Sequence, residues 1–419
     1  MQKIKGSLPL QIFLALGLGI VAGLIFLAAG ATDFTVNYIK PFGTIFLNLL
    51  KFIVVPIVIT SIVQGVVSLS DIKKVGTIGL RTIIYYFCTT AIAITIGLLF
   101  ANLFKGTYKV LQTSDLSYEA AEPTSFMDTI VNIFPSNLFQ PMVDSTMLQI
   151  IVIAIFIGFG IIIAGEKSKV FKDWIDSSYE VFMVIMKGII KVTPIAVFCL
   201  ITPVVAENGP AVLGSLAMVL LTAYLAYFTH ALITYSIAVK TLGHMDPIKF
   251  IKGAFPAFLF AFSSTSSIAT LPVSLECAEK MGARRDVASF TLPLGATINM
   301  DGTAIYQGVC AIFIASCFGI QLTFSQMITI VLTATLASVG TAGTPGAGMI
   351  MLAMVLQSVG LPVEGIALVA GVDRIFDMGR TGINVVGDLS AAVIISDYET
   401  RREAREAKAA AKAKEKAEA

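Results

Sequence analysis

The sequence predicts an all-α integral membrane protein with two re-entrant helical hairpins arranged as inverted repeats. Three observations predict this fold: an apolar composition, long stretches without charge, and two polar breaks inside apolar runs. Of the 419 residues, 56% are hydrophobic and 13% are charged, and the mean hydropathy is +0.86. Soluble domains carry about 25% charged residues, so we expect a chain that crosses the bilayer repeatedly. The net charge of +2 gives no indication of a nucleic-acid partner.

Stretches without a charged residue mark the spans, because about 20 apolar residues cross a bilayer. They occupy residues 6–32, 82–104, 145–165, 208–239 and 253–275, and residues 302–363 contain no Asp, Glu, Lys, Arg or His. The first stretch is as long as a full span and lacks a convincing cleavage site, so we expect a retained first helix rather than a signal peptide. The five cysteines show no paired metal spacing and are expected to be reduced packing residues.

The distribution of basic residues predicts the orientation. By the positive-inside rule the basic segments are cytoplasmic, and so are both termini. The acidic segment 106–128 and residues 207–210 then lie outside. The basic clusters are Lys3 and Lys5; Lys73, Lys74 and Arg81; Lys167, Lys169 and Lys172; Lys240, Lys249 and Lys252; Lys280, Arg284 and Arg285; and the residues from Arg401 onward.

Two polar breaks predict hairpins. Basic clusters flank residues 253–275 on both sides, so this segment should enter the membrane and return, with its tip in the polar, proline-interrupted stretch 263–272 (SSTSSIATLP). A similar break, SVGTAGTPGAG, occupies residues 338–348. Each break is followed by a helix that carries polar residues, at 299–303 and 377–388. Irregular backbone at membrane depth requires a protein or water-lined environment, and inverted repeats of this kind build transporter sites. Two ordinary kinked helices are the alternative, against which the charge placement argues.

The second polar helix carries the main candidate site. Asp377, Arg380 with Thr381, Asn384 and Asp388 follow one another at helical spacing and share one face. An intrahelical Asp377–Arg380 pair that neutralises itself is the simpler interpretation. It does not explain Asn384, Asp388 and the separate Asp301.

Charge and ligand chemistry indicate what this site binds. Asp301, Asp377 and Asp388 against Arg380 leave a charge of −2, which a low dielectric disfavours. Oxygen ligands with no His or Cys nearby favour Na⁺, although protonation of one Asp would also reduce the charge and leaves the stoichiometry open. Arg380 matches a carboxylate and Asp377 an ammonium. With Asn384, Thr303 and hairpin amides for a second carboxylate, aspartate or glutamate fits.

These residues resemble a known family. NMDGTA (299–304), DMGRTGINVVGD (377–388), the 338–348 break and the serine-rich 263–272 segment are similar to the dicarboxylate/amino-acid:cation symporters, in particular the glutamate/aspartate transporters. The resemblance runs from the first helix to about residue 397. It implies eight transmembrane helices plus two hairpins, a homotrimer in the plasma membrane, and a non-enzymatic elevator mechanism that couples Na⁺ entry to uptake of an acidic amino acid.

The resemblance also implies a division of the chain. Residues 1–77 and 106–206 would form the trimerisation scaffold, with helices 1, 2, 4 and 5. Residues 78–105 and 207–397 would form the moving transport domain, with helices 3, 6, 7 and 8 and both hairpins. Residues 398–419 would be a charged cytoplasmic tail.

Site residues carry over position by position. The resemblance implies that Asp377 holds the substrate amino group and Arg380 its side-chain carboxylate, with the site completed by Thr303, Thr381, Asn384, Ser266, Ser267, Gly343 and Gly348. It implies three Na⁺ sites: Asp388 with carbonyls of Gly295, Asn299 and Asn384; carbonyls of Thr297, Ser338, Val339 and Thr341; and Asp301 with Asn299, Tyr86, Thr89 and Thr90.

One departure and several alternatives stay open. Archaeal members carry an arginine where this chain has Thr265, and animal members carry it at the position of Met378, whereas here Arg374 either replaces it or pairs with Asp373. The preference between aspartate and glutamate therefore stays open. A H⁺- or Na⁺-coupled C4-dicarboxylate transporter would leave Asp377 without an ammonium, and a neutral amino-acid carrier would not need Arg380. An intramembrane aspartyl protease needs a two-carboxylate dyad, but VVGD (385–388) lacks the first glycine of its GxGD motif. A passive channel would not need two opposed hairpins.

Overall fold

The computed structural model describes residues 8–68, 77–108, 131, 134–144, 146–338 and 347–418, and every regular element in this part of the chain is helical. The first elements are α1 (Leu8–Ala28), α2 (Thr32–Phe34), η1 (Thr35–Ile39), α3 (Lys40–Ser68), α5 (Thr77–Phe104), η2 (Lys105–Thr107), α7 (Gln140–Val143), α8 (Met147–Ala164), η3 (Gly165–Ser168), α9 (Lys169–Lys191) and α10 (Thr193–Asn208). They are followed by α11 (Ala211–Thr229), η4 (His230–Tyr235), α12 (Ser236–Thr241), α13 (Pro247–Ser264), α14 (Ser267–Met281), α15 (Arg285–Ile298), α16 (Asp301–Cys317), α17 (Phe324–Ala337), α18 (Ala347–Ser358), η5 (Val363–Gly365), α19 (Ile366–Ala370) and α20 (Asp373–Glu418). The all-α prediction is confirmed.

Long apolar helices confirm an integral membrane protein. Six described segments are long and apolar enough to cross a bilayer: Leu10–Ala28, Thr32–Val67, Ile78–Thr107, Gln149–Ile189, Leu213–Thr241 and Arg285–Cys317. Shorter apolar helices are Thr193–Asn208, Phe324–Ala337 and Gly348–Ser358. All five cysteines are free, and four of them are buried, as expected of packing residues.

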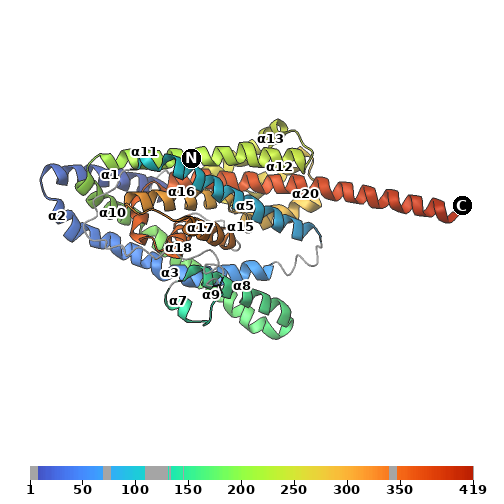
Figure 1. The fold of residues 1–419 in the computed structure, drawn as a ribbon, viewed down its shortest axis with the longest axis horizontal. Coiled ribbons are helices and arrows are strands. Elements are labelled where there is room, and N and C mark those ends of the chain that lie inside the picture. The colour runs from blue at the N-terminus through green and yellow to red at the C-terminus, as the bar shows by residue number, and fades with distance from the viewer. Residues whose placement is uncertain are drawn as a thin grey trace, which may run out of the picture.

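The helices run along the long axis of the molecule, and α20 continues beyond the bundle as one helix (Figure 1). We call the end of the bundle where α20 leaves it the tail end. Arg81, from the first turns of α5, meets α20 there, with Nη1 2.9 Å from Glu399 Oε1. The charged tail continues α20 as a helix as far as Glu418.

The first predicted hairpin is a pair of packed helices, α13 and α14, joined by Thr265 and Ser266. Thr265 adopts a left-handed conformation with φ +54°, which ends α13, and the Ser266 hydroxyl caps α14 by accepting from Ala269 N at 3.2 Å. The unwound part is shorter than the predicted 263–272 stretch. Pro272 lies inside α14 and does not end it. An interior proline removes one backbone hydrogen bond of the helix, and α14 continues past it to Met281.

Both ends of this hairpin lie at the tail end. His244, just before α13, has Nδ1 2.9 Å from Asp397 Oδ2 of α20. Arg284, just after α14, donates its backbone N–H to Ser396 Oγ at 2.7 Å. The chain therefore enters and returns at one end of the bundle.

The second pair, α17 and α18, opens at the opposite end. Gln326 Nε2 donates to Val359 O at 3.0 Å, so the start of α17 lies beside the end of α18. The segment Arg285–Cys317 leads from the tail end to this opposite end. The two units are thus inverted relative to each other. Residues 339–346, which hold most of the predicted second break, lie outside the described residues.

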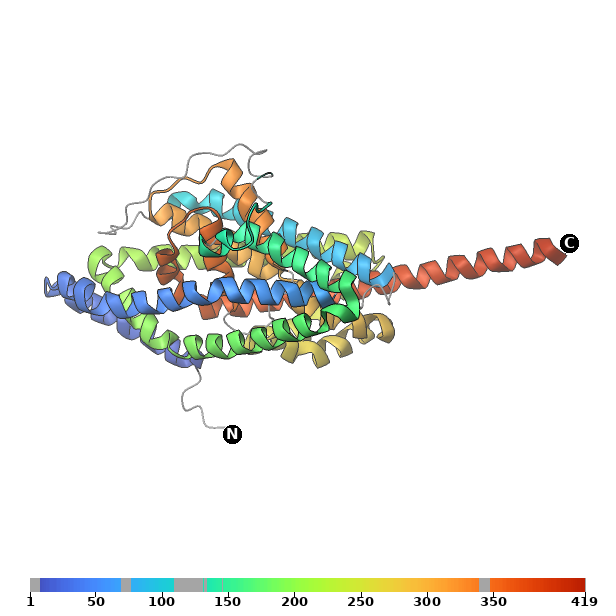
Figure 2. The ribbon, with the colours of Figure 1, turned by 90° about the horizontal axis from the view of Figure 1, so that it is seen from below.

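The helices pack in two groups. One contains α1, α3, α8, α9 and α10, and the other contains α5, α11 to α16 and α20. In the view of Figure 2, α3 lies on the face turned toward the reader, and α20 passes behind it. Two further helices connect the groups: α18 contacts α3 and α8 of the first group and α16 of the second, and α19 contacts α10 of the first and α16 of the second.

Candidate functional site

The polar face of α20 is the centre of the site. Asp377, Arg380, Thr381, Asn384 and Asp388 are all buried, each at most 5% exposed. Their predicted position on one helix face is confirmed. A charged side chain in the middle of a bilayer costs about 2.5–3.5 kcal/mol even on the most lenient scale, so these groups require partners.

Arg380 is held by two carboxylates. Its Nε donates to Asp377 Oδ1 at 2.9 Å, its Nη1 to Asp373 Oδ1 at 2.9 Å, and its Nη2 to Asp373 Oδ2 at 3.3 Å. The guanidinium carbon lies 4.7 Å from the centroid of the Tyr306 ring. A guanidinium has five N–H donors, so one on each terminal nitrogen has no partner among the described residues. The Asp377–Arg380 pair of the simpler interpretation exists, but it leaves Arg380 able to bind a further carboxylate.

The start of α18 lies directly on this arginine. A Cβ added to Gly348 would collide with the Arg380 guanidinium, and one added to Gly302 would collide with the Arg380 backbone. Glycine at both positions lets α16 and α18 approach α20 closely. The predicted neighbour Gly343 lies outside the described residues.

Sequence reasoning missed the role of Asp373. It considered Asp373 only as one of two alternatives for Arg374, whereas the structure pairs Asp373 with Arg380, seven residues and two helical turns along. Arg374 instead donates to Thr265 Oγ1 at the tip of the first hairpin, and its Nη1 lies 3.8 Å from Asp377 Oδ2. Arg374 therefore supplies the cation at the hairpin tip where Thr265 stands. Ser266 and Ser267, the predicted substrate-binding residues of this hairpin, follow Thr265 directly in the chain.

Asn299 and Asn384 join the break between α15 and α16 to α20. Asn299 Nδ2 donates to Asn384 O and to Asp388 Oδ1, both at 2.9 Å. Asn384 Oδ1 accepts from Gly302 N at 2.8 Å, and its Nδ2 is 3.5 Å from Thr303 Oγ1. Asn299 Oδ1 is buried and has no hydrogen-bond partner in the part of the chain that the structure describes. Buried acceptors normally have a donor or another partner, so this oxygen is a candidate cation ligand.

Gly295 lies against the same carboxylate. A Cβ added to Gly295 would collide with Asp388 Oδ1 and would lie 2.5 Å from Tyr86 OH. Tyr86 OH donates to Thr291 O at 3.1 Å. The structure thus brings Gly295, Asn299, Asn384 and Asp388 together, and it places Tyr86 at their edge.

Asp301 lies within hydrogen-bonding distance of three side chains in a fully buried position. Thr90 Oγ1 donates to Oδ1 at 2.6 Å, Tyr235 OH donates to Oδ2 at 2.8 Å, and His230 Nε2 is 3.2 Å from Oδ2. The expectation that no histidine lies near the site is wrong. His230 and Tyr235 are the first and last residues of the π-helical segment η4. Residues five apart are neighbours in a π-helix, whereas the α-helical period does not place them on one face. The hydroxyl of the predicted Thr89 donates to Tyr86 O within its own helix at 3.2 Å.

The predicted second sodium site is described only in part. Thr297 donates its hydroxyl to Leu294 O at 2.8 Å, and Ser338 donates its hydroxyl to Thr335 O at 2.7 Å. Val339 and Thr341 lie outside the described residues. This site therefore stays a prediction.

The site offers oxygen ligands and excess negative charge. Four buried carboxylates face two guanidiniums, a formal charge of −2 when all are ionised: Asp301, Asp373, Asp377 and Asp388 against Arg374 and Arg380. Among the described residues no group of three or more His, Cys, Asp or Glu side chains could hold a metal ion. Carboxylate, amide and hydroxyl oxygens in a negative site suit a hard cation of low charge.

Buried charges at helix breaks, between two inverted helical pairs in a bundle of apolar helices, define a membrane protein of the secondary-transporter class. Residues 8–398 match the family model of the sodium:dicarboxylate symporter family, and the chain belongs to this family.

Curated relatives cover nearly the whole chain. A proton/sodium-glutamate symport protein of Geobacillus stearothermophilus is 38% identical over 404 residues, which are 94% of this chain and 95% of the relative. A proton/glutamate-aspartate symporter of Escherichia coli (strain K12) is 36% identical over 425 residues, 97% of this chain and 96% of the relative. A C4-dicarboxylate transport protein of Bacillus subtilis (strain 168) is 31% identical over 407 residues, 95% of this chain and 94% of the relative.

Proposed function

We propose that this symporter couples inward Na⁺ flow to the uptake of an acidic amino acid, L-aspartate or L-glutamate. The observation that carries the proposal is Arg380, buried beside Asp377, with one N–H on each terminal nitrogen that has no partner among the described residues. The free donors would bind the side-chain carboxylate of the substrate. Asp377 would bind its ammonium, while Asn384, Thr303, Thr381 and the amides of the two hairpin tips would bind its α-carboxylate.

Sodium would neutralise the remaining charge. Asp388, Asn299 Oδ1 and the carbonyls around Gly295 and Asn384 are the oxygen atoms available for one ion, and Asp301 with Thr90 for another. With the predicted second site at Thr297, Ser338, Val339 and Thr341, three ions per protomer would offset the charge of −2 and leave +1 for a substrate of net charge −1. Ion binding and substrate binding would then favour each other electrostatically.

Gly295→Ala tests the first sodium site in this scheme. The added methyl group would lie between Asp388 and the Tyr86 hydroxyl, so we expect the Na⁺ concentration for half-maximal stabilisation against heat to rise at least about tenfold, which corresponds to ~1.4 kcal/mol. The measurement is the melting temperature of the purified protein at increasing Na⁺. Gly214→Ala is the matched control, because nothing lies within 4 Å of its added Cβ. Equal Na⁺ dependence in the two variants would place the ion elsewhere.

The architecture supports an elevator mechanism. We propose that α1, α3 and α8 to α10 form the fixed scaffold of a homotrimer, and that α5, α11 to α18 and α20 form the moving transport domain with the α17–α18 hairpin as the outer gate. The two packed groups support this division. In this arrangement the chain has eight spans and two re-entrant hairpins, the tail end faces the cytoplasm, and the membrane is the plasma membrane.

A C4-dicarboxylate is the second candidate substrate, because one relative carries that name. Succinate has no ammonium and would leave Asp377 facing only Arg380 and Arg374. Saturating ligand stabilises a protein by about 2.7 kcal/mol at 100 times its Kd, so melting temperatures in Na⁺ with L-aspartate, L-glutamate or succinate compare the candidates directly. We expect stabilisation by an acidic amino acid and not by succinate. The reverse result would assign the protein to dicarboxylate transport.

A further inference from the structure

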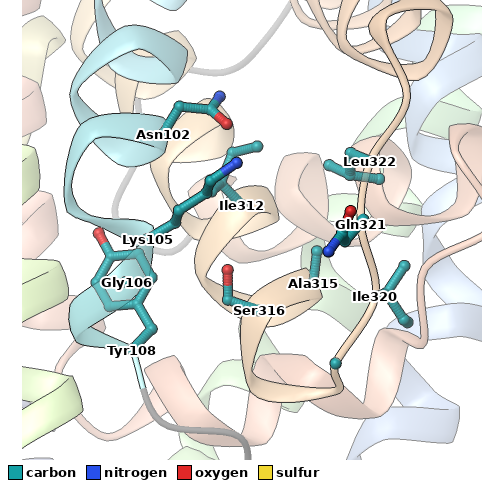
Figure 3. A pocket seen from close by; sticks show the side chains of 11 residues that line it. Asn102, Lys105, Gly106, Tyr108, Ile312, Ala315, Ser316, Ile320, Gln321 and Leu322 are labelled. Atoms are coloured by element: carbon teal, nitrogen blue, oxygen red, sulfur yellow. The ribbon is translucent and has the colours of Figure 1, made fainter.

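A cavity of about 390 Å³ lies at the end of the bundle opposite the tail end. Its walls are the end of α5 with η2, the end of α16, and the extended residues that lead into α17 (Figure 3). Ser316, which lines it, lies fifteen residues beyond Asp301 on α16, which is about 22 Å along a helix. The cavity contains no residue of the Arg380 cluster and has no part in the mechanism proposed above.

Among the described residues that line this cavity, Lys105 carries the one charge and none is a carboxylate. The ends of Asn102, Lys105, Ser316 and Gln321 face the same space (Figure 3). Lys105 and Gln321 are exposed, so the cavity opens to the surface. Neither side chain, nor that of Ser316, has a hydrogen-bond or ion-pair partner among the described residues. An ammonium group flanked by an amide donor and a hydroxyl favours a carboxylate ligand.

Asn102 adds an acceptor to this set. Its Nδ2 donates to Leu98 O at 3.0 Å, so its Oδ1 is the atom left for a ligand. The remaining wall includes the apolar side chains of Ile312 and Leu322. Three donors and one acceptor around a small cavity match a carboxylate and an ammonium carried by one small molecule.

We propose that this cavity is a second, outward-facing subsite for the acidic amino acid, with Lys105, Ser316 and Gln321 binding a carboxylate and Asn102 Oδ1 the ammonium. The inference rests on the proposed function, because the substrate class is taken from it. A low-affinity subsite at the outer end of the transport domain would raise the local substrate concentration beside the α17–α18 hairpin. It would therefore lower KM without changing the maximal rate.

The test is binding of radiolabelled L-aspartate to the full-length protein carrying Arg380→Ala, which removes the central carboxylate partner. We expect residual millimolar binding that weakens about 3- to 5-fold on adding Lys105→Gln, the size of one partly exposed ion pair. Lys105→Arg should restore it. Lys40→Gln is the matched control, since Lys40 also lies at the end opposite the tail end but does not line the cavity. In the otherwise native protein, Lys105→Gln should raise the KM of uptake by a similar factor at unchanged maximal rate.

Each other outcome overturns the assignment. Residual binding that Lys105→Gln leaves unchanged would place the aspartate outside the cavity. Displacement by equimolar acetate would show a general anion site and not a substrate subsite. No residual binding in the Arg380→Ala protein, with intact binding in the native protein, would remove this subsite and leave the proposed function standing. No aspartate binding by the native protein would remove both.

Discussion

Replacing Arg380 by alanine is expected to abolish uptake of acidic amino acids while sodium binding stays measurable. The variant removes the guanidinium that would hold the substrate side-chain carboxylate and leaves Asp373 and Asp377 without their shared partner. Truncating one partner of a buried, hydrogen-bonded charge pair weakens binding by about 2–5 kcal/mol, so uptake at low aspartate concentration should fall at least about thirtyfold. Two readouts separate the effects: aspartate uptake into proteoliposomes, and the melting temperature as a function of Na⁺ and of aspartate.

Arg285→Ala is the matched control for Arg380→Ala, because its side chain is 85% exposed and lies outside the site. It should transport normally. If Arg380→Ala transported aspartate as well as this control does, the carboxylate assignment would be wrong. If Arg380→Ala lost its response to Na⁺ as well, the arginine would be needed for the structure of the ion sites.

The second large effect is expected at Asp388. Asp388→Asn keeps the shape of the side chain but removes a charge that sits beside Asn299 and Gly295. Charge is the main reason for a monovalent ion to enter a buried site. We therefore expect the Na⁺ concentration for half-maximal uptake to rise at least about tenfold, which corresponds to ~1.4 kcal/mol of ion-binding free energy. The measurement is the initial rate of aspartate uptake at increasing Na⁺.

Asp397→Asn is the control for this substitution on the same helix, nine residues nearer the tail end, where the side chain pairs with His244 and Arg401. It should leave the Na⁺ dependence unchanged. An unaltered Na⁺ response in Asp388→Asn would move the ion to another ligand set.

Much of the fold follows from simple patterns in the sequence. Apolar length predicts the spans, and the basic residues on both sides of residues 253–275 predict a hairpin that returns to the same end. The contacts of His244 and Arg284 show that α13 begins and α14 ends beside one region of α20, while their position in a membrane stays a prediction. The exact break was harder to predict. Pro272 looks like a helix end in the sequence, yet the chain unwinds at Thr265 and Ser266, where the Ser266 cap starts the next helix.

Spacing alone predicted the site only where the α-helical period applies; groupings across helices, such as Asn299 with Asp388, came only from the resemblance. Asp377, Arg380, Asn384 and Asp388 share a face of one regular helix, so their convergence could be read directly. Asp373 lies on that face two turns before Arg380, so the same spacing also predicts the Asp373–Arg380 pair. Tertiary contacts gave no such signal: His230 reaches Asp301 from a π-helical turn.

The contact between Arg374 and Thr265 shows what a single sequence leaves open. The two residues are 109 positions apart, and only the resemblance, which offered Arg374 as a replacement for an arginine at the position of Thr265, connected them. The hydrogen bond between them places an arginine of α20 at the tip of the first hairpin, where the chain itself has Thr265.

The central claim is tested most directly by uptake of radiolabelled L-aspartate into proteoliposomes under an inward Na⁺ gradient. Excess L-glutamate, succinate and L-serine serve as competitors, and an inward proton gradient without Na⁺ is the control. We predict uptake that requires the Na⁺ gradient, that L-glutamate inhibits in proportion to its own affinity, and that succinate and L-serine leave unchanged. Uptake driven by protons alone, or blocked by succinate, would contradict the account, because a protonated aspartate would then replace a sodium ion or Asp377 would not bind an ammonium.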